Sequence, residues 1–307
     1  MTSRLHGVLI TYRRPQQLVR TLDWLAGQDR RLDSLVVVDN ASGAEGRGAI
    51  ERFRRLGHAV RYLPAPENLG PAGGRALGMR HLLPTVQDED WLVMLDDDIR
   101  PYPPSTLGDL ERFAGDMLSH DPKTGGVGLR GVRFDWRRAR SVRVPDEELN
   151  GAVSVDYHPT GHSPFYLVRA VRDVGAFHAP LFIGLTELEF GLRLRRAGYS
   201  LYAPSQTVRQ SRLVRLGQDV RPSRRVEEPD WRKYYSLRNL VYILRMNGHP
   251  LRALKVTLVR GLGKPAANLF LSPSGAVRYL RMSVRACWDA WAGNMGRTVE
   301  PDESYTS

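Results

Sequence analysis

Three consecutive aspartates, Asp96, Asp97 and Asp98, are the residues of this sequence best suited to chemistry. They directly follow the apolar run 91–95, which predicts a strand buried on both faces. Three like charges at the end of a buried strand repel one another, so they need a cation or hydrogen-bond donors nearby. Because side chains alternate along an extended chain, Asp96 and Asp98 are expected to face one ligand. The triplet predicts a divalent cation held against a phosphate, and the alternative is a solvated acidic turn.

Two further groups of residues are candidates for contact with the same ligand. Asp39 ends a predicted strand, where its carboxylate would accept hydrogen bonds from a nucleobase or a ribose; a turn or helix-cap aspartate is an equally common alternative. Residues 68–78 are rich in glycine and are predicted to form a loop that leads into a helix. The backbone amides of this loop and Arg75 would face an anion at the helix N-terminus. The alternative is tight packing of a helix against a strand.

Glu187 is the candidate general base. It would occupy the first position of a predicted helix over residues 186–197. Thr186 and Glu189 match a capping box. The box explains why a glutamate stands at position 189, but it does not explain the glutamate at position 187. An ionised carboxylate at the edge of a cleft is suited to take a proton, and the alternative is simple complementarity to the helix dipole.

The elements that must position these residues alternate between strand and helix. Strands are predicted over residues 5–12, 34–39, 59–63 and 91–95, with helices over 15–26, 45–57 and from the glycine-rich segment to about residue 84. This alternation predicts a parallel sheet with right-handed crossovers. After residue 101, a helix over 105–118 and short strands near 126–134 and 151–157 predict a less regular, partly antiparallel half.

The predicted organisation is a catalytic domain with a C-terminal extension. Residues 1–207 form the domain, with a nucleotide-binding half over about 1–100 and an acceptor and base half over about 101–207. Residues 208–230 carry many charges and two prolines, which predicts a mobile basic loop, and residues 231–307 are predicted to be helical.

The composition is that of a soluble globular protein, with 42% hydrophobic and 25% charged residues in a chain of 307. A lone cysteine, Cys287, excludes an internal disulfide and fits a reducing compartment, and no stretch has the length of a membrane-spanning helix. We therefore expect a cytoplasmic location. The net charge of +12 comes from the C-terminal third, where residues 209–297 hold 18 Lys and Arg against 5 Asp and Glu. Nucleic acid, an anionic membrane surface and an anionic lipid-linked substrate would each suit this charge.

Two apolar stripes with helical spacing lie in this basic region, each beside basic residues. The stripes are Leu251, Leu254, Leu258 and Leu262 beside Arg252 and Lys255, and Val277, Leu280, Val284, Trp288 and Trp291 beside Arg278, Arg281 and Arg285. Such stripes predict packing onto the rest of the domain, with contact to a membrane surface as the alternative.

Six motifs, in this order and spacing, resemble family 2 glycosyltransferases of the GT-A fold, and among them the actinobacterial rhamnosyl- and galactofuranosyltransferase-like members. They are TYRRP at 11–15, VVVDN at 36–40, NLGPAGG at 68–74, DDD at 96–98, the segment 181–193 with its ELE sequence, and YYSLRN at 234–239. The resemblance runs from about residue 5 to residue 247. It implies an α/β fold with a Rossmann-like, mostly parallel central sheet flanked by helices, a mixed acceptor-side half and a helical C-terminal extension.

The resemblance also implies an activity and the residues that carry it. The activity is transfer of a sugar, with inversion, from a nucleoside diphosphate sugar to an acceptor hydroxyl, with Mg²⁺ or Mn²⁺ held by Asp98 and Asp96 and with Glu187 as the base. Residues expected to bind the donor are Thr11, Arg13, Asp39, Asn68, Gly70, Gly74, Arg75, Asp96, Asp97 and Arg238. The donor would be dTDP-rhamnose or a UDP-sugar, and the acceptor a lipid-linked glycan or a small natural product. Relatives often place a histidine ligand where this chain has Gln210, so either the metal is held more weakly or Arg209 and its basic neighbours take over part of the charge neutralisation. Of the two, we expect a weakened but real metal dependence.

Two other classes of function remain as alternatives. A nucleotide-sugar-binding protein or a nucleotidyltransferase would use Asp96 and Asp98 but would give Glu187 no chemical role. A nucleic-acid-binding protein would use the basic C-terminal third and its aromatic residues. The acidic strand ends would repel nucleic acid, so none is expected as a partner. We expect a place at the inner face of the plasma membrane, and the oligomeric state is left open.

Overall fold

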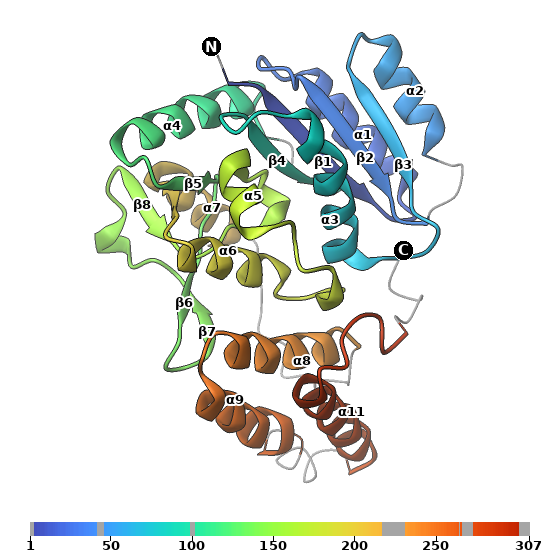
Figure 1. Ribbon diagram of the computed structural model, residues 1–307, viewed down its shortest axis with the longest axis vertical. Coiled ribbons are helices and arrows are strands. Elements are labelled where there is room, and N and C mark those ends of the chain that lie inside the picture. The colour runs from blue at the N-terminus through green and yellow to red at the C-terminus, as the bar shows by residue number, and fades with distance from the viewer. Residues whose placement is uncertain are drawn as a thin grey trace. The chain divides into compact units, whose positions relative to one another are not determined.

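The computed structural model describes residues 3–41, 46–98, 102–216, 231–263, 265 and 273–300 (Figure 1). The chain divides into two compact units. The first comprises Met1–Arg133, Val142–Ala179 and Glu187–Gly217, and the second comprises Phe134–Ser141, Pro180–Thr186 and Gln218–Ser307. The predicted domain boundaries at residues 207 and 230 stay a prediction.

An eight-stranded sheet organises the first unit, in the order β3-β2-β1-β4-β9-β5-β10-β8. The strands are Leu5–Thr11 (β1), Ser34–Asp39 (β2), Val60–Pro64 (β3), Trp91–Asp96 (β4), Thr124–Val127 (β5), Ala152–Val155 (β8), Phe165–Leu167 (β9) and Ser200–Pro204 (β10). The four strands β3, β2, β1 and β4 are parallel, whereas β9 runs antiparallel to both β4 and β5, and β8 runs antiparallel to β10. The predicted parallel half and the partly antiparallel half are both confirmed.

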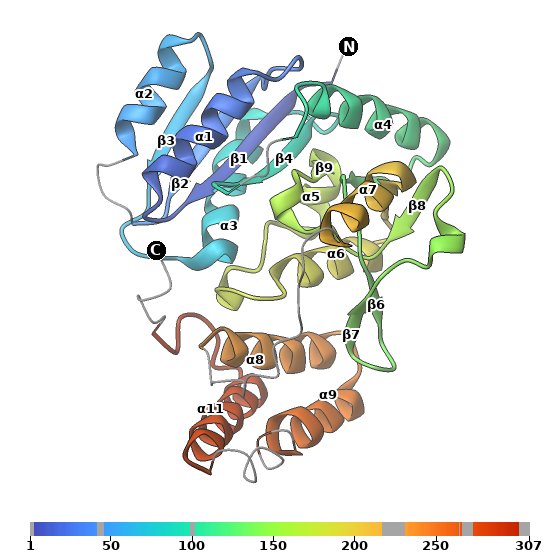
Figure 2. The ribbon, with the colours of Figure 1, turned by 180° about the vertical axis from the view of Figure 1, so that it is seen from behind.

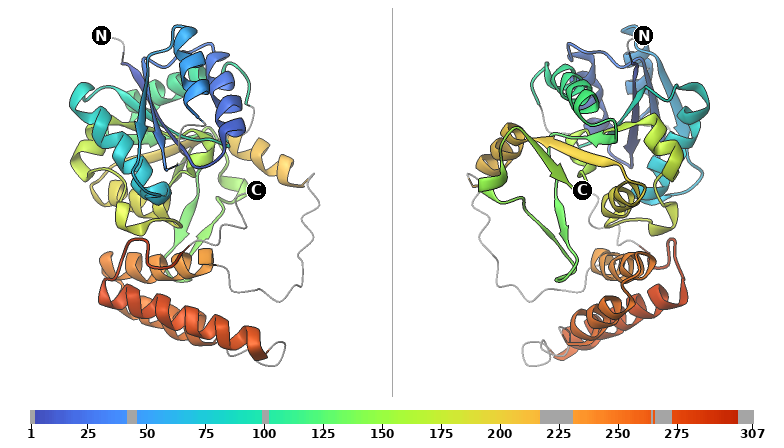
Figure 3. Two further views of the ribbon diagram at one scale, coloured as in Figure 1. Left: turned by 90° about the vertical axis from the view of Figure 1, so that its right-hand side faces the viewer. Right: turned by 60° about the vertical axis from the view of Figure 1, so that its left-hand side comes forward.

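Helices cover both faces of this sheet. They are Pro15–Ala26 (α1), Arg47–Arg55 (α2), Gly70–Leu82 (α3), Thr106–His120 (α4), Val168–Val174 (α5), Thr186–Arg196 (α6) and Ser205–Leu216 (α7). Helices α1 and α2 pack together on one face, whereas α3 packs on β1 and β2 from the other face (Figure 2 and the left view of Figure 3). Right-handed crossovers produce this arrangement, because the chain runs outward from β1 to β3 and then returns across the sheet to β4.

The glycine-rich segment is helical, so the prediction of a loop there was wrong. Helix α3 begins at Gly70, whose φ of +66° is readily adopted only by glycine. A Cβ atom at Gly78 would lie 2.4 Å from the side chain of Val8, and one at Gly74 would lie 3.1 Å from the side chain of Ile10. The glycines therefore let α3 lie close against β1, which is the packing alternative raised by the sequence. Glycine is a poor helix former, and tertiary packing overrides that propensity here.

The core lies between the sheet and its helices. The side chains of the predicted run 91–95 are buried, as are those of β1 and most of β2. Each large apolar side chain moved from water into such a core contributes about 1.5–3 kcal/mol. The central strands β1 and β4 are therefore the best-anchored elements, and the ends of these strands are fixed positions for side chains.

The basic segment predicted as a loop over residues 208–230 starts as helix. Residues 208–216 belong to α7, where Val208 packs into the core and the Thr207 hydroxyl donates to the Pro204 carbonyl. The remainder, residues 217–230, lies outside the described residues.

The second unit is mostly helical, as predicted from residue 231 onward. It contains Trp231–Met246 (α8), Pro250–Val256 (α9), the π-helical segment Thr257–Gly263 and Pro273–Ala292 (α11). It also contains residues 134–141, which are most of a small hairpin of Arg133–Asp135 (β6) and Arg140–Val142 (β7). Gly248, with a φ of +77°, lies between the end of α8 at Met246 and the start of α9 at Pro250. Helix α8 packs against both α9 and α11.

Candidate functional site

The carboxyl ends of three adjacent parallel strands carry the candidate site. Thr11 of β1 lies opposite Asp39 of β2, and Ile10 of β1 lies opposite Asp96 of β4. Neighbouring strands lie about 4.8 Å apart, so the backbones at Asp39 and Asp96 are roughly 10 Å apart across β1. In open α/β sheets, ligands bind outside this edge.

Asp97 is the buried member of the aspartate triplet. Its carboxylate accepts hydrogen bonds from Thr11 Oγ1 at 2.9 Å and from the Tyr12 amide at 3.3 Å, and the residue is only 7% exposed. Burial raises the pKa of Asp97 to about 6, against the opposing effect of the Thr11 hydrogen bond and the charge of Arg14. The side chain therefore ties the end of β4 to the end of β1.

Asp96 and Asp98 lie in different surroundings. Asp96 is the last residue of β4 and is partly buried, whereas Asp98 lies in the following turn, where its side chain is 57% exposed and 3.5 Å from Arg14. The alternation of side chains holds for extended chain, and the strand ends at Asp96. A shared ligand for the two carboxylates therefore stays a prediction.

Arg75 of helix α3 is a buried cation between two carboxylates. Its Nη2 donates to Asp96 Oδ1 at 2.6 Å, and its Nη1 donates to Glu187 Oε1 at 3.3 Å. Burial lowers the pKa of Arg75, but the charges of Asp96 and Glu187 raise it more, so the net pKa lies above its usual range. The guanidinium is thus a permanent positive charge that joins the end of β4 to the start of α6.

Thr160 completes this network. It lies in the short turn Thr160–His162, and its hydroxyl is 3.0 Å from Asp96 Oδ2 and 2.9 Å from Glu187 Oε1. Arg75 Nη2 donates to the same hydroxyl at 2.5 Å. Because a hydroxyl carries a single proton, Thr160 donates to one carboxylate at a time. The structure therefore brings three of the predicted residues together, Asp96, Arg75 and Glu187, around a threonine that the sequence did not single out.

Three other side chains beside this turn are buried and polar. His158 Nε2, Ser163 Oγ and Tyr166 Oη have no hydrogen-bond partner within the described part of the chain. Burial lowers the pKa of His158 to about 4, so its ring is neutral at pH 7, and burial together with the charge of Glu187 raises the pKa of Tyr166. An unpaired buried polar atom costs about 1–3 kcal/mol, which is typical of a place where a ligand or water completes the hydrogen bonding. The polar segment HPTGHS at 158–163, between β8 and β9, is the sequence signal that could have pointed to this turn.

The opposite end of the site surrounds Asp39. This residue is 1% exposed, and Tyr62 Oη donates to its Oδ2 at 2.5 Å. Burial and the Asp39 carboxylate raise the pKa of Tyr62. Asn40, the next residue, accepts from the Leu69 amide at 2.9 Å and donates to Asn68 at 3.1 Å. These contacts hold the start of α3 against the end of β2.

The other predicted donor-binding residues fall into two places. Thr11, Arg13, Asn68, Gly70 and Gly74 lie at the ends of β1 and β2 or at the start of α3. Arg238 lies in the second unit, where it is fully buried and donates to the carbonyls of Gly296 and Leu181. The contribution of each of these residues to donor binding stays a prediction.

The segment that replaces the family histidine lies on helix α7. Gln210 is exposed there, while its neighbour Arg209 donates to the Leu149 carbonyl at 2.8 Å. Arg212, one turn further on, pairs with Asp146. Arg209 and Arg212, whose charges were expected to compensate for the missing histidine, thus make contacts with residues 146–149 instead of being available only to a ligand.

A divalent cation fits the carboxylates at the end of β4. Asp98 is exposed, and Asp96 uses one lone pair of each oxygen for Arg75 and Thr160, so each carboxylate retains oxygen lone pairs. Mg²⁺ typically takes one or two carboxylates and completes its shell with phosphate oxygens and water. Within the described residues, no group of three or more His, Cys, Asp or Glu side chains could hold a metal by itself. The donor set therefore fits a metal bound together with a phosphate.

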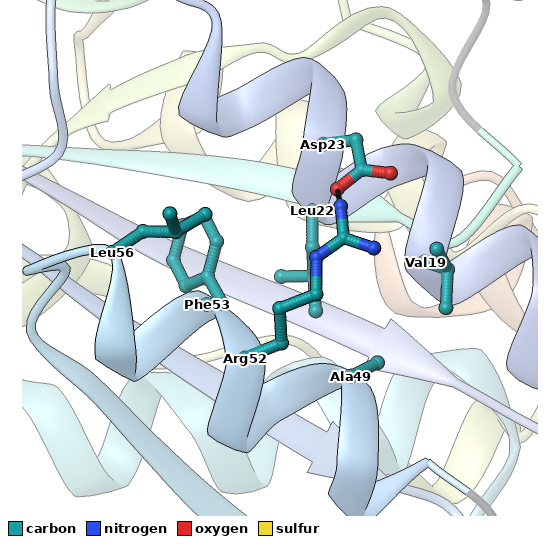
Figure 4. A pocket seen from close by; sticks show the side chains of 7 residues that line it. All are labelled: Val19, Leu22, Asp23, Ala49, Arg52, Phe53 and Leu56. Atoms are coloured by element: carbon teal, nitrogen blue, oxygen red, sulfur yellow. Dashed lines mark hydrogen bonds and ion pairs between the residues drawn. The ribbon is translucent and has the colours of Figure 1, made fainter.

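Two hollows lie away from these strand ends. One, of about 10 Å³, lies between α1 and α2 and is bridged by an ion pair of Arg52 with Asp23; it has room for one water molecule at most (Figure 4). The other, of about 1110 Å³, lies at the amino ends of the strands and is lined by charged residues that pair with one another, such as Arg30 with Glu111. Among the residues described, no helix is long and apolar enough to span a membrane.

This mixed sheet with flanking helices is the GT-A fold, as solved structures show. The mannosyltransferase PcManGT from Pyrobaculum calidifontis, in complex with GDP-Man and Mn²⁺, aligns over 96% of this chain and 87% of its own, with a TM-score of 0.52 and 17% identity. The enzyme GalNAc-T7, crystallised with UDP, GalNAc and Mn²⁺, aligns over 79% of this chain and 48% of its own, with a TM-score of 0.55 and 12% identity. At these identities the likeness concerns the fold alone.

Sequence comparisons identify the family. Residues 8–122 match the family described as glycosyl transferase family 2. The galactofuranosyltransferase GlfT1 of Mycobacterium tuberculosis is 32% identical over 210 residues, which cover 64% of this chain and 66% of that protein. The galactofuranosyltransferase GlfT2 of Mycolicibacterium smegmatis is 27% identical over 271 residues, covering 77% of this chain and 40% of that protein. The chain belongs to glycosyl transferase family 2, and its match spans slightly less than two thirds of the length of the first of these relatives.

Proposed function

We propose that this protein is an inverting, metal-assisted glycosyltransferase with Glu187 as its general base. The observation that carries the proposal is the network around Arg75, in which the carboxylate that ends β4 and the carboxylate of Glu187 are bound by one guanidinium. The first carboxylate lies at the edge where open α/β sheets generally bind ligands. The second is partly buried and is the family's candidate base.

In the proposed mechanism, Glu187 accepts the proton of the acceptor hydroxyl. The hydroxyl oxygen attacks the anomeric carbon on the face opposite the nucleoside diphosphate. A carbon–oxygen bond forms to the acceptor as the bond to the diphosphate breaks, so the configuration inverts and the diphosphate leaves with the bonding electrons. A bound Mg²⁺ or Mn²⁺, held by Asp98 and Asp96, would supply positive charge to the departing diphosphate.

Arg75 and Thr160 would orient the base. Both contact Glu187 Oε1, and these two contacts would fix the orientation of the carboxylate that receives the proton. A base positioned in this way contributes about 10²–10⁴-fold to the rate. Asp39, Thr11 and the start of α3 would bind the nucleoside, and Asp97 would support the strand end beneath it.

For the donor we propose a UDP-sugar, with galactofuranose as the first candidate. The relatives that support this choice are named galactofuranosyltransferases, which favours the UDP-sugar over dTDP-rhamnose. For the acceptor we propose a hydroxyl of a lipid-linked glycan at the cytoplasmic face of the membrane, with a small natural product as the second candidate.

The proposal is tested by a matched pair of variants on helix α6. Glu187→Gln should keep the affinity for the donor nucleotide within about twofold and lower turnover by about 10²–10⁴-fold, measured as sugar transfer or nucleotide release. The control Glu189→Gln alters a carboxylate that pairs with Arg193 at 2.7 Å, and it should retain turnover. Near-normal turnover in Glu187→Gln would remove this residue as the base.

The metal role is tested by binding. UDP, dTDP and GDP should raise the melting temperature more with Mn²⁺ than without it, and Asp98→Ala should abolish the Mn²⁺-dependent part. Equal affinity of Asp98→Ala for UDP with Mn²⁺ would contradict a metal at this position. Stabilisation by oligonucleotides with none by any nucleotide would support the nucleic-acid-binding alternative instead.

A further inference from the structure

The apolar stripes of the second unit are exposed, whereas the sequence favoured their burial. Leu251 is 80% exposed and Trp288 is 69% exposed. The other large apolar side chains exposed on α9, the π-helical segment and α11 are Leu254, Leu258, Val259, Leu262, Val277, Val284 and Trp291. The prediction that both stripes pack onto the rest of the domain was therefore wrong for these positions. The buried faces of the same helices use smaller residues, including Ala253, Ala276, Ala286 and Ala290.

Two contacts show how the exposed residues are arranged. Trp291 Nε1 donates to Thr257 Oγ1 at 3.1 Å, and a Cβ atom at Gly261 would lie 2.7 Å from Cys287 Sγ. Gly261 comes after Thr257 in the π-helical segment, whereas its contact Cys287 comes before Trp291 in α11. The π-helical segment and α11 therefore run antiparallel. In an antiparallel pair of right-handed helices, the residue one position after a contact residue is rotated out of the interface. It turns to the same side of the pair in both helices.

This rule places most of these exposed side chains on one surface. Leu258 and Leu262 follow Thr257 and Gly261 by one position, and Trp288 follows Cys287 by one position. The residues one to three turns earlier on the same side are Leu254, Leu251, Val284 and Val277. The result is one apolar surface along both helices, called here the helix-pair surface.

The charge around the helix-pair surface is positive. Arg281 lies on the same side of α11 as Val277 and Trp288. Lys255 and Arg278 lie at the margin of the surface, because each is the next residue after one of its apolar residues. All three basic side chains are exposed. Residues 250–263 and 273–292 together contain 6 Lys and Arg against one acid. That acid is Asp289, which is buried and accepts a hydrogen bond from Tyr234 at 2.5 Å.

We propose that the helix-pair surface docks on an anionic membrane, with its apolar side chains inserted among the lipids and its basic residues against the headgroups. An apolar surface with exposed tryptophans and a basic margin is the pattern of helices that lie in a membrane interface. A protein partner would require acidic residues opposite this margin, whereas an anionic bilayer supplies negative charge across the whole area. The inference goes beyond the transfer reaction and does not depend on it.

The test is co-sedimentation of the full chain with vesicles. Binding to vesicles of phosphatidylcholine with about one third phosphatidylglycerol should exceed binding to pure phosphatidylcholine by at least tenfold, and high salt should weaken it because ions screen the headgroup attraction. The double variant Leu258→Ser with Trp288→Ser should lower the partition coefficient by at least tenfold. The triple variant Lys255→Gln, Arg278→Gln and Arg281→Gln should reduce binding to anionic vesicles to the level seen with neutral ones.

The chain offers a matched control for the apolar change. Leu56, at the end of α2 in the first unit, is 52% exposed, as is Leu258. Leu56→Ser should leave vesicle binding unchanged, and Glu187→Gln should bind vesicles like the wild type even where transfer is lost. Melting curves of the double variant should match the wild type, since the altered side chains are exposed.

Three results would overturn the proposal. The first is a folded wild type that binds neither kind of vesicle, and the second is a double variant that binds as well as the wild type. The third is a concentration-dependent dimer that the double variant dissociates while vesicle binding is absent; it would assign the helix-pair surface to a second copy of the chain.

Discussion

Arg75 and Arg238 are two buried arginines whose surroundings differ in kind. Arg75 donates to the carboxylates of Asp96 and Glu187, and these charges raise its pKa. Arg238 donates to backbone carbonyls, including those of Leu181 and Gly296, and its guanidinium lies 4.8 Å from the centre of the Tyr235 ring. Burial lowers the pKa of Arg238, the opposite of the net direction at Arg75.

The difference suggests what each arginine does. Carbonyl oxygens and aromatic faces satisfy a guanidinium without offering a group that reacts, so Arg238 is suited to hold the fold of the second unit together. The carboxylates of Asp96 and Glu187 are held in place by Arg75 and still reach solvent. The sequence predicted both arginines as donor-binding residues, because spacing and family motifs do not reveal the type of acceptor. Four substitutions test this difference between the two arginines and their neighbours.

The largest expected effect is on stability, from Arg238→Met. The change removes several buried hydrogen bonds of one guanidinium, including those to the carbonyls of Gly296 and Leu181, so the free energy of unfolding should fall by about 3–5 kcal/mol. Urea denaturation measures it, with the exposed Arg232→Met on the same helix as the control. A loss below about 1 kcal/mol would show that the buried contacts of Arg238 contribute little to folding.

Arg75→Met should act mainly on turnover. Without the guanidinium, Asp96 and Glu187 repel each other and lose their common orientation, so transfer should fall by about 10²-fold or more. The unfolding free energy should change less than in Arg238→Met, because both carboxylates reach solvent. Steady-state kinetics and urea denaturation on the same samples give both numbers, and a larger loss of stability than of transition-state stabilisation would reverse the contrast.

Asp97→Asn should stabilise the protein at neutral pH. The folded-state pKa of about 6 lies above the ordinary value of 3.8, so the contribution of Asp97 is fully present below pH 3.8 and is lost as the pH rises through 6. The asparagine variant lacks this titration, and its advantage over wild type should grow across that window to at most about 3 kcal/mol. Thermal melts from pH 4 to pH 7.5 in a metal-chelating buffer measure the difference. An advantage that is constant with pH would mean that Asp97 does not titrate in this way.

The smallest expected effect is that of Thr160→Val. Valine keeps the volume of threonine and removes the hydroxyl that contacts Asp96 and Glu187, so turnover should fall by roughly tenfold and stability by about 1 kcal/mol. Thr160→Ser, which restores the hydroxyl, should recover most of the turnover. If serine fails to rescue, the methyl group rather than the hydrogen bond matters at this position.

Much of the first unit could be predicted from the sequence because its signals are local. The helix over residues 15–26 starts at Pro15, and the strands over 34–39 and 91–95 are continuous apolar runs, so their bounds are correct within about one residue. The glycine-rich segment misled because propensity acts locally, whereas its contacts with Val8 and Ile10 depend on a strand more than sixty residues earlier.

The candidate site was predictable only in part, for a similar reason. The aspartate triplet and Glu187 stand out by charge at the ends of apolar segments. Thr160 is a small polar residue in a turn, and it meets Asp96 across 64 positions of sequence. Neither the periodicity nor the composition of the sequence indicates a contact between residues so far apart along the chain. The exposure of the two apolar stripes in the second unit was also beyond the sequence, since helical spacing shows that a stripe exists without showing what covers it.

Two glycines of α3, Gly74 and Gly78, determine how far the Arg75 side chain can extend. Without side chains at these positions, the helix axis lies close enough to β1 for a guanidinium three residues from Gly78 to extend to the neighbouring strand end. A single methyl group at residue 78 would act as a spacer, lifting the helix and shortening that reach. The position of the Arg75 guanidinium thus depends on two glycines that lack a side chain, and we expect substitutions there to displace Arg75 from Asp96 and Glu187 before they unfold the chain.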